Sequence, residues 1–241
     1  MNDTVASEIA HFTNLSHIWW GAKTVAGQKR YDNKLTLFQQ NCNVRSGARI
    51  LEVGCGDGEF TKRLSQMKTR NVTITATDIT PRVVTRARKH IKNPKVTFQI
   101  DNLENMRFKR RSFDIVCGIS ILHHVTLQKS LHEIYRVLKN GGKIFFTEPN
   151  LLNPNIYLGL HIPILRRKME FSKHERAFIR WQLQKELLKA GFIHVEVKNY
   201  DFLHPLIPAR YIHHAERIGH IAEKLPLIKE ISGSLMIYAE K

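Results

Sequence analysis

The chain has 241 residues, of which 42% are hydrophobic and 24% are charged, a composition that is typical of globular proteins and excludes a largely disordered chain. It carries 38 Lys and Arg against 21 Asp and Glu, so the formal net charge is +17, and nucleic acid, an anionic membrane surface or an acidic substrate would each fit such an excess. Three cysteines in no C-x-x-C pair, an N-terminus without a signal-peptide pattern and the lack of a membrane-spanning apolar run predict a cytoplasmic protein.

The first 45 residues have a polar, helical pattern that includes the aromatic residues Trp19, Trp20 and Tyr31. From residue 48, short apolar segments that predict strands alternate with segments of helical spacing. The strands are expected at 48–53, 72–78, 95–100, 113–119 and 143–147, and the helices at 59–67, 81–90 and 127–138. Thr80 and Pro81 predict the start of the second helix, and the sequence Asn140-Gly141-Gly142 predicts a left-handed turn that ends the third.

This alternation predicts a doubly wound α/β fold, with a mostly parallel sheet, helices on both faces and a ligand site at the carboxyl ends of the central strands. After Pro149 the alternation lapses, and a lid is expected before a helix at 172–190. The domains expected are a helical cap at 1–45, a ligand-binding core at 46–149, a lid and return helix at 150–190, and final strands with a helical insertion at 191–241, which complete the core.

A glycine-rich loop, Glu52-Val53-Gly54-Cys55-Gly56-Asp57-Gly58, lies between the first predicted strand and the first predicted helix. Glycine allows the backbone to turn sharply there and lets a ligand lie close over the helix N-terminus. The position of the loop favours a mononucleotide site over an ordinary tight turn. Cys55 is interpreted as a small turn residue and not as a nucleophile.

Acidic residues follow the next two strands. Asp78 lies 78 − 58 = 20 residues beyond the last glycine, where an acid accepts both ribose hydroxyls of an adenosine-type ligand, and NAD fits that feature equally well. The G-x-G-x-G spacing, together with Glu52 before the loop and Asp101 after the third strand, discriminates between the two ligands. Crowded carboxylates suit a ligand that carries an ammonium and a sulfonium, which indicates S-adenosylmethionine.

Five motifs between about residues 48 and 148 carry a family resemblance in their order and spacing: LEVGCGDGEF, TATDIT, FQIDNLENMRF, SFDIVCGISILHHV and LHEIYRVLKNGGKIFFTEPN. The chain resembles the class I S-adenosylmethionine-dependent methyltransferases of the small-molecule type that includes quinone-biosynthesis enzymes. The resemblance implies a seven-stranded Rossmann-like sheet with an antiparallel final strand, S-adenosylmethionine as cofactor with S-adenosylhomocysteine as product, and no metal. The cofactor contacts that it implies are Glu52, Gly54, Cys55, Gly56, Asp57, Gly58, Asp78, Ile79, Asp101, Asn102, Leu103, Gly118 and Ile119.

In that arrangement the glycine loop would line the methionine part, Asp78 would hold the ribose and Asp101 would accept from the adenine amino group. A base is needed only for a protonated acceptor, and the candidates are His124 and then His123, which otherwise would pack or cap the following segment. Trp19, Trp20 and Tyr31 are candidates for a pocket roof or for ordinary core positions. No metal is expected, because adjacent histidines point to different sides of an element.

The basic residues gather in three places: the helix with Arg82, Arg86 and Lys89, the turn Lys109-Arg110-Arg111, and the lid cluster Arg166-Arg167-Lys168. The first two are interpreted as solvated surface. The lid cluster follows the apolar segment IYLGLHIPIL and would meet anionic lipid or gather an amphiphilic substrate.

The predicted function is therefore methyl transfer by in-line displacement to a small-molecule acceptor, with a lipid-like acceptor as the finer hypothesis. The net charge favours a tRNA or rRNA methyltransferase as the alternative. Against it, the fourth strand ends in Gly118-Ile119-Ser120 and lacks the [DNS]-P-P-[YFW] motif of amino-directed nucleic-acid enzymes. A non-catalytic protein is disfavoured by the intact loop. Oxygen, carbon and nitrogen all remain open as the methylated atom.

Overall fold

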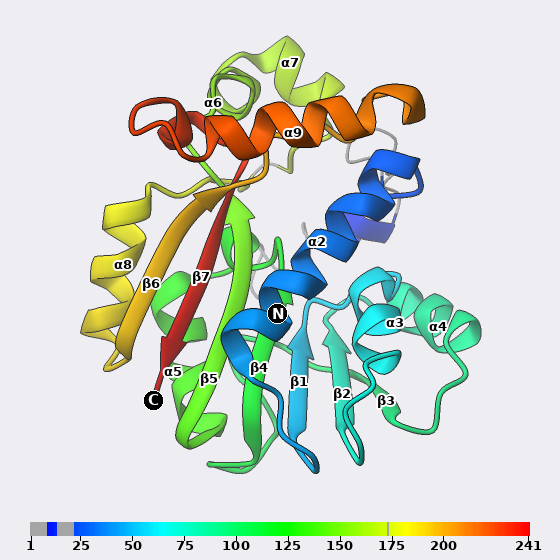
Figure 1. Cartoon of the computed structure of the whole chain (residues 1–241). Coiled ribbons are helices and arrows are strands. Elements are labelled where there is room, and N and C mark those ends of the chain that lie inside the picture. The colour runs from blue at the N-terminus through cyan, green and yellow to red at the C-terminus, as the bar shows by residue number, and fades with distance from the viewer. Residues whose placement is uncertain (1–8, 14–21, 173) are drawn as a thin grey trace.

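A computed structural model describes residues 9–13, 22–172 and 174–241 (Figure 1). Its centre is a seven-stranded sheet with the order β3-β2-β1-β4-β5-β7-β6. The strands β1 to β5 run parallel, and β7 is antiparallel to both β5 and β6. The strands are β1 (Arg49–Val53), β2 (Thr73–Asp78), β3 (Val96–Ile100), β4 (Phe113–Ile119), β5 (Leu138–Pro149), β6 (Ile193–Tyr200) and β7 (Ser234–Glu240). The expected fold class, with its antiparallel final strand, is confirmed.

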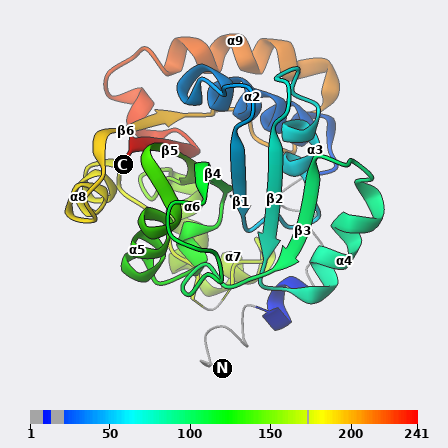
Figure 2. The same ribbon diagram turned by 90° about the horizontal axis from the view of Figure 1, so that it is seen from below.

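Helices cover both faces of the sheet (Figure 2). On one face lie α2 (Val25–Cys42) and α3 (Glu59–Ser65), and on the other lie α5 (Leu127–Val137) and α8 (Arg180–Lys189). The helix α4 (Pro81–His90) packs against β2 and β3. Across the top of the sheet in Figure 1 lie α6 (Pro154–His161), α7 (Pro163–Lys168) and α9 (Ile212–Ala222). Short 3-10 turns are η1 (Leu122–His124), η2 (Ala209–Tyr211) and η3 (Ile228–Ile231).

The central strands β1 and β4 are mostly apolar because both of their faces are buried. In β1, Ile50 packs with Phe38 of α2 and Phe60 of α3, whereas the next residue, Leu51, packs with the layer that contains α5 and α8. The Phe38 ring meets Phe60 and Phe145 edge to face, with centroids 6.0 and 5.5 Å away. This contact fixes the C-terminal half of α2 on the sheet.

Polar contacts join the first half of α2 to segments late in the sequence. The Thr24 hydroxyl caps α2 by accepting from the Gly27 N–H at 3.0 Å, and it donates to the Pro205 carbonyl at 2.6 Å. The Arg30 guanidinium pairs with Asp201 at 2.7 Å. The residues from 201 to 205 therefore lie against α2 on the same side of the molecule.

Two predicted boundaries were wrong. The third predicted helix ends at Val137, and Leu138 is already extended and paired with Phe113, so the two glycines lie inside β5 and not in a helix C-cap. Gly141 has φ +69° and donates its N–H to the Lys241 carbonyl, at the place where the pairing of β4 with β5 shifts register. The shift, and not a helix end, requires the glycines.

The helix expected at 172–190 begins only at Arg180. The segment before it is extended, because Phe178 exchanges backbone hydrogen bonds with Pro149 and Leu151. Thr80 precedes α4 and Pro81 is its first residue, as expected, but the Thr80 side chain makes no capping bond. None of the helices within the described residues has the length and apolar character needed to cross a membrane. The domain boundaries stay predictions, and Trp19 and Trp20 lie outside the described residues.

Phe38→Ala is expected to lower the free energy of unfolding by about 3–5 kcal/mol, because the ring is fully buried between two other aromatic rings. Urea denaturation followed by circular dichroism measures the effect. Ile164→Ala removes a side chain that is 76% exposed and should change the stability little. Equal losses in the two variants would contradict the anchoring role of Phe38.

Candidate active site

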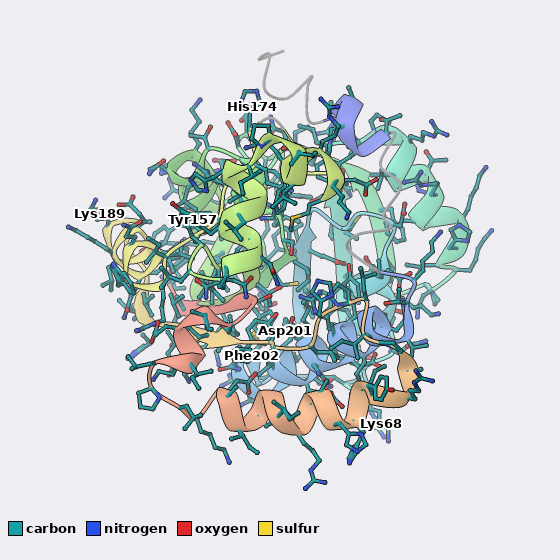
Figure 3. All side chains as sticks on the ribbon, turned by 90° about the horizontal axis from the view of Figure 1, so that it is seen from above. Lys68, Tyr157, His174, Lys189, Asp201 and Phe202 are labelled. Atoms are coloured by element: carbon teal, nitrogen blue, oxygen red, sulfur yellow. The ribbon has the colours of Figure 1, made fainter. Side chains whose placement is uncertain are left out.

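A cavity of about 720 Å³ lies at the carboxyl ends of the parallel strands, which is within the range of small-molecule sites. Its wall is built from the segments that follow β1, β2, β3 and β4, and from α2, α6 and the residues 201–205. Figure 3 shows this end of the molecule from above, with Tyr157 on α6 and with Asp201 and Phe202 in the connection from β6 to α9.

Most of the residues predicted to contact a cofactor line this cavity. They are Glu52, Gly54, Cys55, Gly56, Asp57, Asp78, Ile79, Asp101, Asn102, Leu103 and Ile119. Tyr31, His123 and His124 line it as well. Gly58 and Gly118 do not belong to the lining, although they were predicted with the others.

Those two glycines have structural surroundings. A Cβ atom on Gly58 would lie 2.4 Å from the Ile91 side chain, and Gly58 caps the N-terminus of α3 with a left-handed backbone. A Cβ atom on Gly118 would lie 2.9 Å from the Val53 carbonyl oxygen, so its absence allows β1 and β4 to approach each other. Both glycines therefore allow the close packing that supports the cavity wall, without lining the cavity themselves.

The glycine loop and Asp78 form one hydrogen-bonded unit. Gly56 has φ +53°, and apart from its chain neighbours no described residue would lie within 4 Å of a Cβ atom built on it, so the loop faces open space there. One Asp78 carboxylate oxygen accepts the Gly56 N–H at 3.1 Å, and the other accepts the Thr80 N–H at 2.9 Å. The loop is therefore held against the end of β2, with the Asp78 carboxylate at the cavity wall.

Glu52 contributes a buried carboxyl group beneath the loop. Its side chain is only 2% exposed, and its Oε2 atom has no hydrogen-bond partner among the described residues. Burial, with the neighbouring Asp78 charge as a further contribution, raises the pKa of Glu52 to about 8. A buried carboxyl oxygen without a partner suits a ligand that brings a hydrogen-bond donor or a positive charge.

The other two carboxylates of the predicted set already have partners. Asp101 is buried and accepts the backbone N–H groups of Asn102 at 3.0 Å and Arg107 at 3.2 Å. Asp57 pairs with Arg86 of α4 at 2.8 Å. Arg86, which was predicted to belong to a solvated basic face of α4, is thus paired with an acid of the glycine loop.

A cluster of histidine and glutamate side chains lies at the end of the cavity beside β4 and β5. The Glu148 carboxylate accepts the backbone N–H groups of Ile121 at 3.0 Å and Leu122 at 2.8 Å. Its Oε2 atom lies 2.6 Å from His123 Nδ1, and His123 Nε2 lies 3.7 Å from Glu175 Oε1. Burial raises the pKa of Glu148 to about 7. The His123 imidazole therefore stands between two carboxyl groups.

His124 lies beside this pair and has a different environment. Its ring packs against the Phe12 ring at 4.9 Å and the His123 ring at 4.0 Å, measured between centroids. Potential metal-ligand atoms of His123, His124 and Glu175 lie within 4.8 Å of one another. The two adjacent histidines thus bring ring nitrogens close together, although their adjacency in the sequence predicted that they point to different sides. That the protein binds no metal stays a prediction.

Sequence reasoning missed Glu148, Glu175 and the α2 cations Arg30 and Lys34, all of which line the cavity or contact its lining. The sequence held a signal for Glu148, because this acid lies next to the last residue of β5, much as Asp78 is the last residue of β2. Glu175 fell inside the first part of the helix predicted at 172–190, and that part does not form because the helix begins only at Arg180. No pattern distinguishes the two cations from other polar residues of α2.

Comparison with known proteins shows which sequences this chain resembles. Residues 51–146 match the family described as a methyltransferase domain. The ubiquinone biosynthesis O-methyltransferase of Nitrosococcus oceani is 31% identical over 63% of this chain and 65% of its own length. That of Azotobacter vinelandii is 29% identical over 66% of this chain and 68% of its own length. The match thus spans slightly less than two thirds of the first relative.

The fold has solved counterparts. An S-adenosylmethionine-dependent methyltransferase from Thermotoga maritima superposes with a TM-score of 0.66 at 22% identity, over 97% of this chain and 98% of its own. With the sequence matches, it confirms the resemblance to the class I S-adenosylmethionine-dependent methyltransferases.

Glu52 should make the stability of the ligand-free protein depend on pH. Its pKa is about 8 when folded and near 4.3 when unfolded, so the folded state holds an extra proton between these values. Stability contributed by that proton is present below about pH 4 and is lost as the pH rises through about 8, by an amount on the order of 5 kcal/mol.

Glu52→Gln should remove this pH dependence, so that urea denaturation at several pH values gives a flatter profile than for the original protein. Glu196→Gln is the matched control, because that side chain is 47% exposed on β6, and it should keep the original profile. An unchanged profile in the Glu52 variant would show that this carboxyl group is not protonated on folding.

Proposed function

Since the chain carries a class I S-adenosylmethionine-dependent methyltransferase domain, we propose that it methylates a small-molecule acceptor by in-line displacement. The observation that carries this proposal is the joining of the open glycine loop, Asp78 and the buried Glu52 in a single cavity. S-adenosylmethionine, when bound, supplies a methyl group that a sulfonium has already activated. The protein has to bind both molecules, align them and exclude water.

The cavity wall fits this cofactor. The loop at Gly56 leaves room for the methionine part, and the Glu52 carboxyl oxygen without a partner suits its ammonium group. Asp78 is held by two backbone N–H groups in a position to accept ribose hydroxyls, and Asp101 is held in the same way near the adenine end. These contacts are proposals that rest on the family motif and on the geometry.

We assign the acceptor to the class of amphiphilic aromatic compounds with a hydroxyl group, which is methylated on oxygen. The relatives are named as O-methyltransferases of ubiquinone biosynthesis. Apolar side chains from α6 and its neighbours face the cavity, as an apolar acceptor requires: Ile156, Met169, Phe202 and Leu203.

His123 is the better candidate for the base. Glu148 holds its Nδ1 atom at 2.6 Å, which fixes the ring. We propose that Nε2, which lies 3.7 Å from Glu175 Oε1, accepts the hydroxyl proton. As the proton moves to Nε2, the Glu148 carboxylate stabilises the resulting imidazolium, and the acceptor oxygen becomes the nucleophile. We propose that His124, whose ring packs against those of Phe12 and His123, contacts the acceptor.

A tRNA or rRNA acceptor is disfavoured by the charge of the cavity. Glu104, Glu148 and Glu175 line or adjoin its acceptor end, and carboxylates at that end oppose the phosphates of a polynucleotide. Arg86, one of the predicted surface cations, is paired with Asp57. The basic face of α4 is therefore partly neutralised beside the glycine loop.

The top of the molecule is a candidate membrane-facing surface. Large apolar side chains are exposed on the helices α6, α7 and α9 and on the segment after α9, including Tyr157, Ile164, Ile218 and Leu227. Arg167 and Lys168 of α7 and Arg210, Arg217 and Lys224 near α9 are exposed beside them. Apolar and basic side chains together are typical of surfaces that bind anionic lipid.

Arg166 differs from the rest of the lid cluster. Its guanidinium donates to the carbonyls of Leu160 at 3.0 Å and Ser172 at 2.5 Å. It therefore holds α7 in place, and Arg167 and Lys168 are the members of the cluster to substitute in a test of membrane binding.

The function is tested with labelled S-adenosylmethionine and a catechol that carries a long alkyl chain. The protein should methylate the catechol oxygen. His123→Asn keeps a donor toward Glu148 but removes the base, so kcat should fall by about 100-fold or more while affinity for S-adenosylhomocysteine, measured by calorimetry, stays constant. Asp78→Ala, in contrast, should weaken the binding of S-adenosylhomocysteine by about tenfold or more.

Asp32→Ala is the control for Asp78, because Asp32 lies on α2 outside the cavity lining. Failure of the original protein to bind S-adenosylhomocysteine would overturn the proposal. Methylation of a tRNA transcript but of no small molecule would favour the alternative function.

For the membrane-facing surface, the protein should sediment with vesicles of phosphatidylglycerol and not with vesicles of phosphatidylcholine. The double variant Arg167→Ala/Lys168→Ala should bind the anionic vesicles about 30-fold more weakly, at about 1 kcal/mol per charge. Lys109→Ala/Arg110→Ala removes the same charge from a turn before β4 and should bind like the original protein. Equal weakening by both pairs would indicate attraction by net charge alone.

A further inference from the structure

The His123 imidazole has a second carboxyl neighbour, Glu175, to which the proposed function gives no role. Glu175 is 9% exposed and lines the cavity. Its Oε1 atom lies 3.7 Å from His123 Nε2, whereas Glu148 Oε2 lies 2.6 Å from Nδ1, on the other side of the ring. A distance of 3.7 Å is longer than a hydrogen bond, so the direct effect of Glu175 on the ring is that of its charge.

Glu175 belongs to a non-helical segment between α7 and α8, termed the strap, whose described residues are 172 and 174–179. Both ends of the strap are held by hydrogen bonds. Arg166 of α7 donates to the Ser172 carbonyl at 2.5 Å, and Phe178 exchanges backbone hydrogen bonds with the residues around the end of β5. Moving the strap away from the cavity would break these bonds.

The Glu175 carboxylate is oriented by the strap itself. Its Oε2 atom accepts the Ser172 N–H at 2.7 Å, and its Oε1 atom faces His123. Ser172 is buried, and Arg166 holds its carbonyl group. A series of contacts therefore joins the lid helix α7 to the candidate base through Ser172 and Glu175.

Among the described residues, charged and titratable groups approach His123 from several elements. Glu148 lies on β5, His124 follows in the same turn, and Glu175 and Arg176 lie on the strap. The Arg176 guanidinium donates to backbone carbonyls of the turn after β4. A protonated His123 ring thus has a carboxyl group beside each of its two nitrogens.

Methyl transfer to a hydroxyl oxygen creates a positive charge on this ring. The proton moves from the acceptor oxygen to His123 Nε2, an electron pair of that oxygen forms the bond to the methyl carbon, and the electron pair of the carbon–sulfur bond stays on sulfur. A carboxylate within about 4–6 Å favours the charged form of a cationic neighbour. Glu175 lies within that distance, on the side of the ring where the proton arrives.

We propose that Glu175 is a positioning residue for the base: held by the strap, its carboxylate stabilises the protonated His123 ring on the Nε2 side and so speeds removal of the acceptor proton. The inference rests on the proposed function and extends it to the lid. Arg166 of α7 holds the residue that orients Glu175, so the lid helix and the base form one unit.

Two substitutions of Glu175 separate its charge from its shape. Glu175→Gln keeps the size of the side chain and removes the charge, whereas Glu175→Asp keeps the charge on a shorter side chain. With the alkyl catechol as acceptor, kcat should fall by about tenfold in the Gln variant and by only about threefold in the Asp variant, with the KM for S-adenosylmethionine unchanged. A purely structural role would reverse this order, because Gln has the same shape as Glu.

A matched control and a double variant show through which group Glu175 acts. Glu186→Gln removes the same charge from α8 and should keep the original kcat. In the His123→Asn background, Glu175→Gln should change the remaining rate by less than about twofold, because the group that it assists is gone. An equal loss in both backgrounds would overturn the proposal.

The ring can also be observed without cofactor or acceptor. Nuclear magnetic resonance follows the protonation of His123 in the ligand-free protein, and the His123→Asn variant identifies its signals by their loss. Glu175→Gln should lower the pH at which the ring titrates by about one pH unit or more. Glu186→Gln should leave that pH unchanged.

The outcomes separate this inference from the proposed function. If the original protein neither binds S-adenosylhomocysteine nor methylates an acceptor, the proposed function fails, and the ring titration still decides whether Glu175 stabilises the imidazolium. If the original protein is active and Glu175→Gln has the same kcat and the same ring titration, only the role of Glu175 is overturned. If Glu175→Gln does not fold, an unchanged kcat and ring titration in Glu175→Asp overturn that role.

Discussion

The parallel direction of five strands is the constraint on which the site depends, because it brings the residues after each strand to one edge of the sheet. Asp78, Asp101 and Glu148 follow or end three of these strands, and each carboxylate accepts two backbone N–H groups from the turns beside it. Main-chain dipoles orient these acids, so their positions do not depend on the exact side chains of a surface loop. Negative groups can therefore lie close together around a ligand.

The cavity separates charge between its two sides. Carboxylates lie on the side of the strand ends and the glycine loop, whereas Arg30 and Lys34 lie on the side of α2. A zwitterionic ligand with an adenosine group matches such a division better than a uniformly charged one. The net charge of +17 describes the outer surface and says little about this interior.

The sequence predicted the strands and the glycine loop well, because buried parallel strands are continuous apolar runs and the turn after β1 needs glycine. The helix end predicted at Asn140-Gly141-Gly142 was wrong. A helix end and a shift in strand register both favour glycine, and only the pairing of β4 with β5 distinguishes the two. The contact of His123 with Glu148 joins residues 25 positions apart, and no local pattern encodes it. Lys34 resembles any polar helix residue until the packing of α2 turns it toward the cavity.

The position of β7 has a consequence for the order of folding during synthesis. β7 lies between β5 and β6, and among the described strands β6 pairs with β7 alone. Until residues 234–240 leave the ribosome, β5 is the open edge of a five-stranded sheet, and β6 has no partner. An edge with unpaired backbone groups invites association with other chains, so a ribosome-stalled chain lacking β7 would be the form most prone to aggregate.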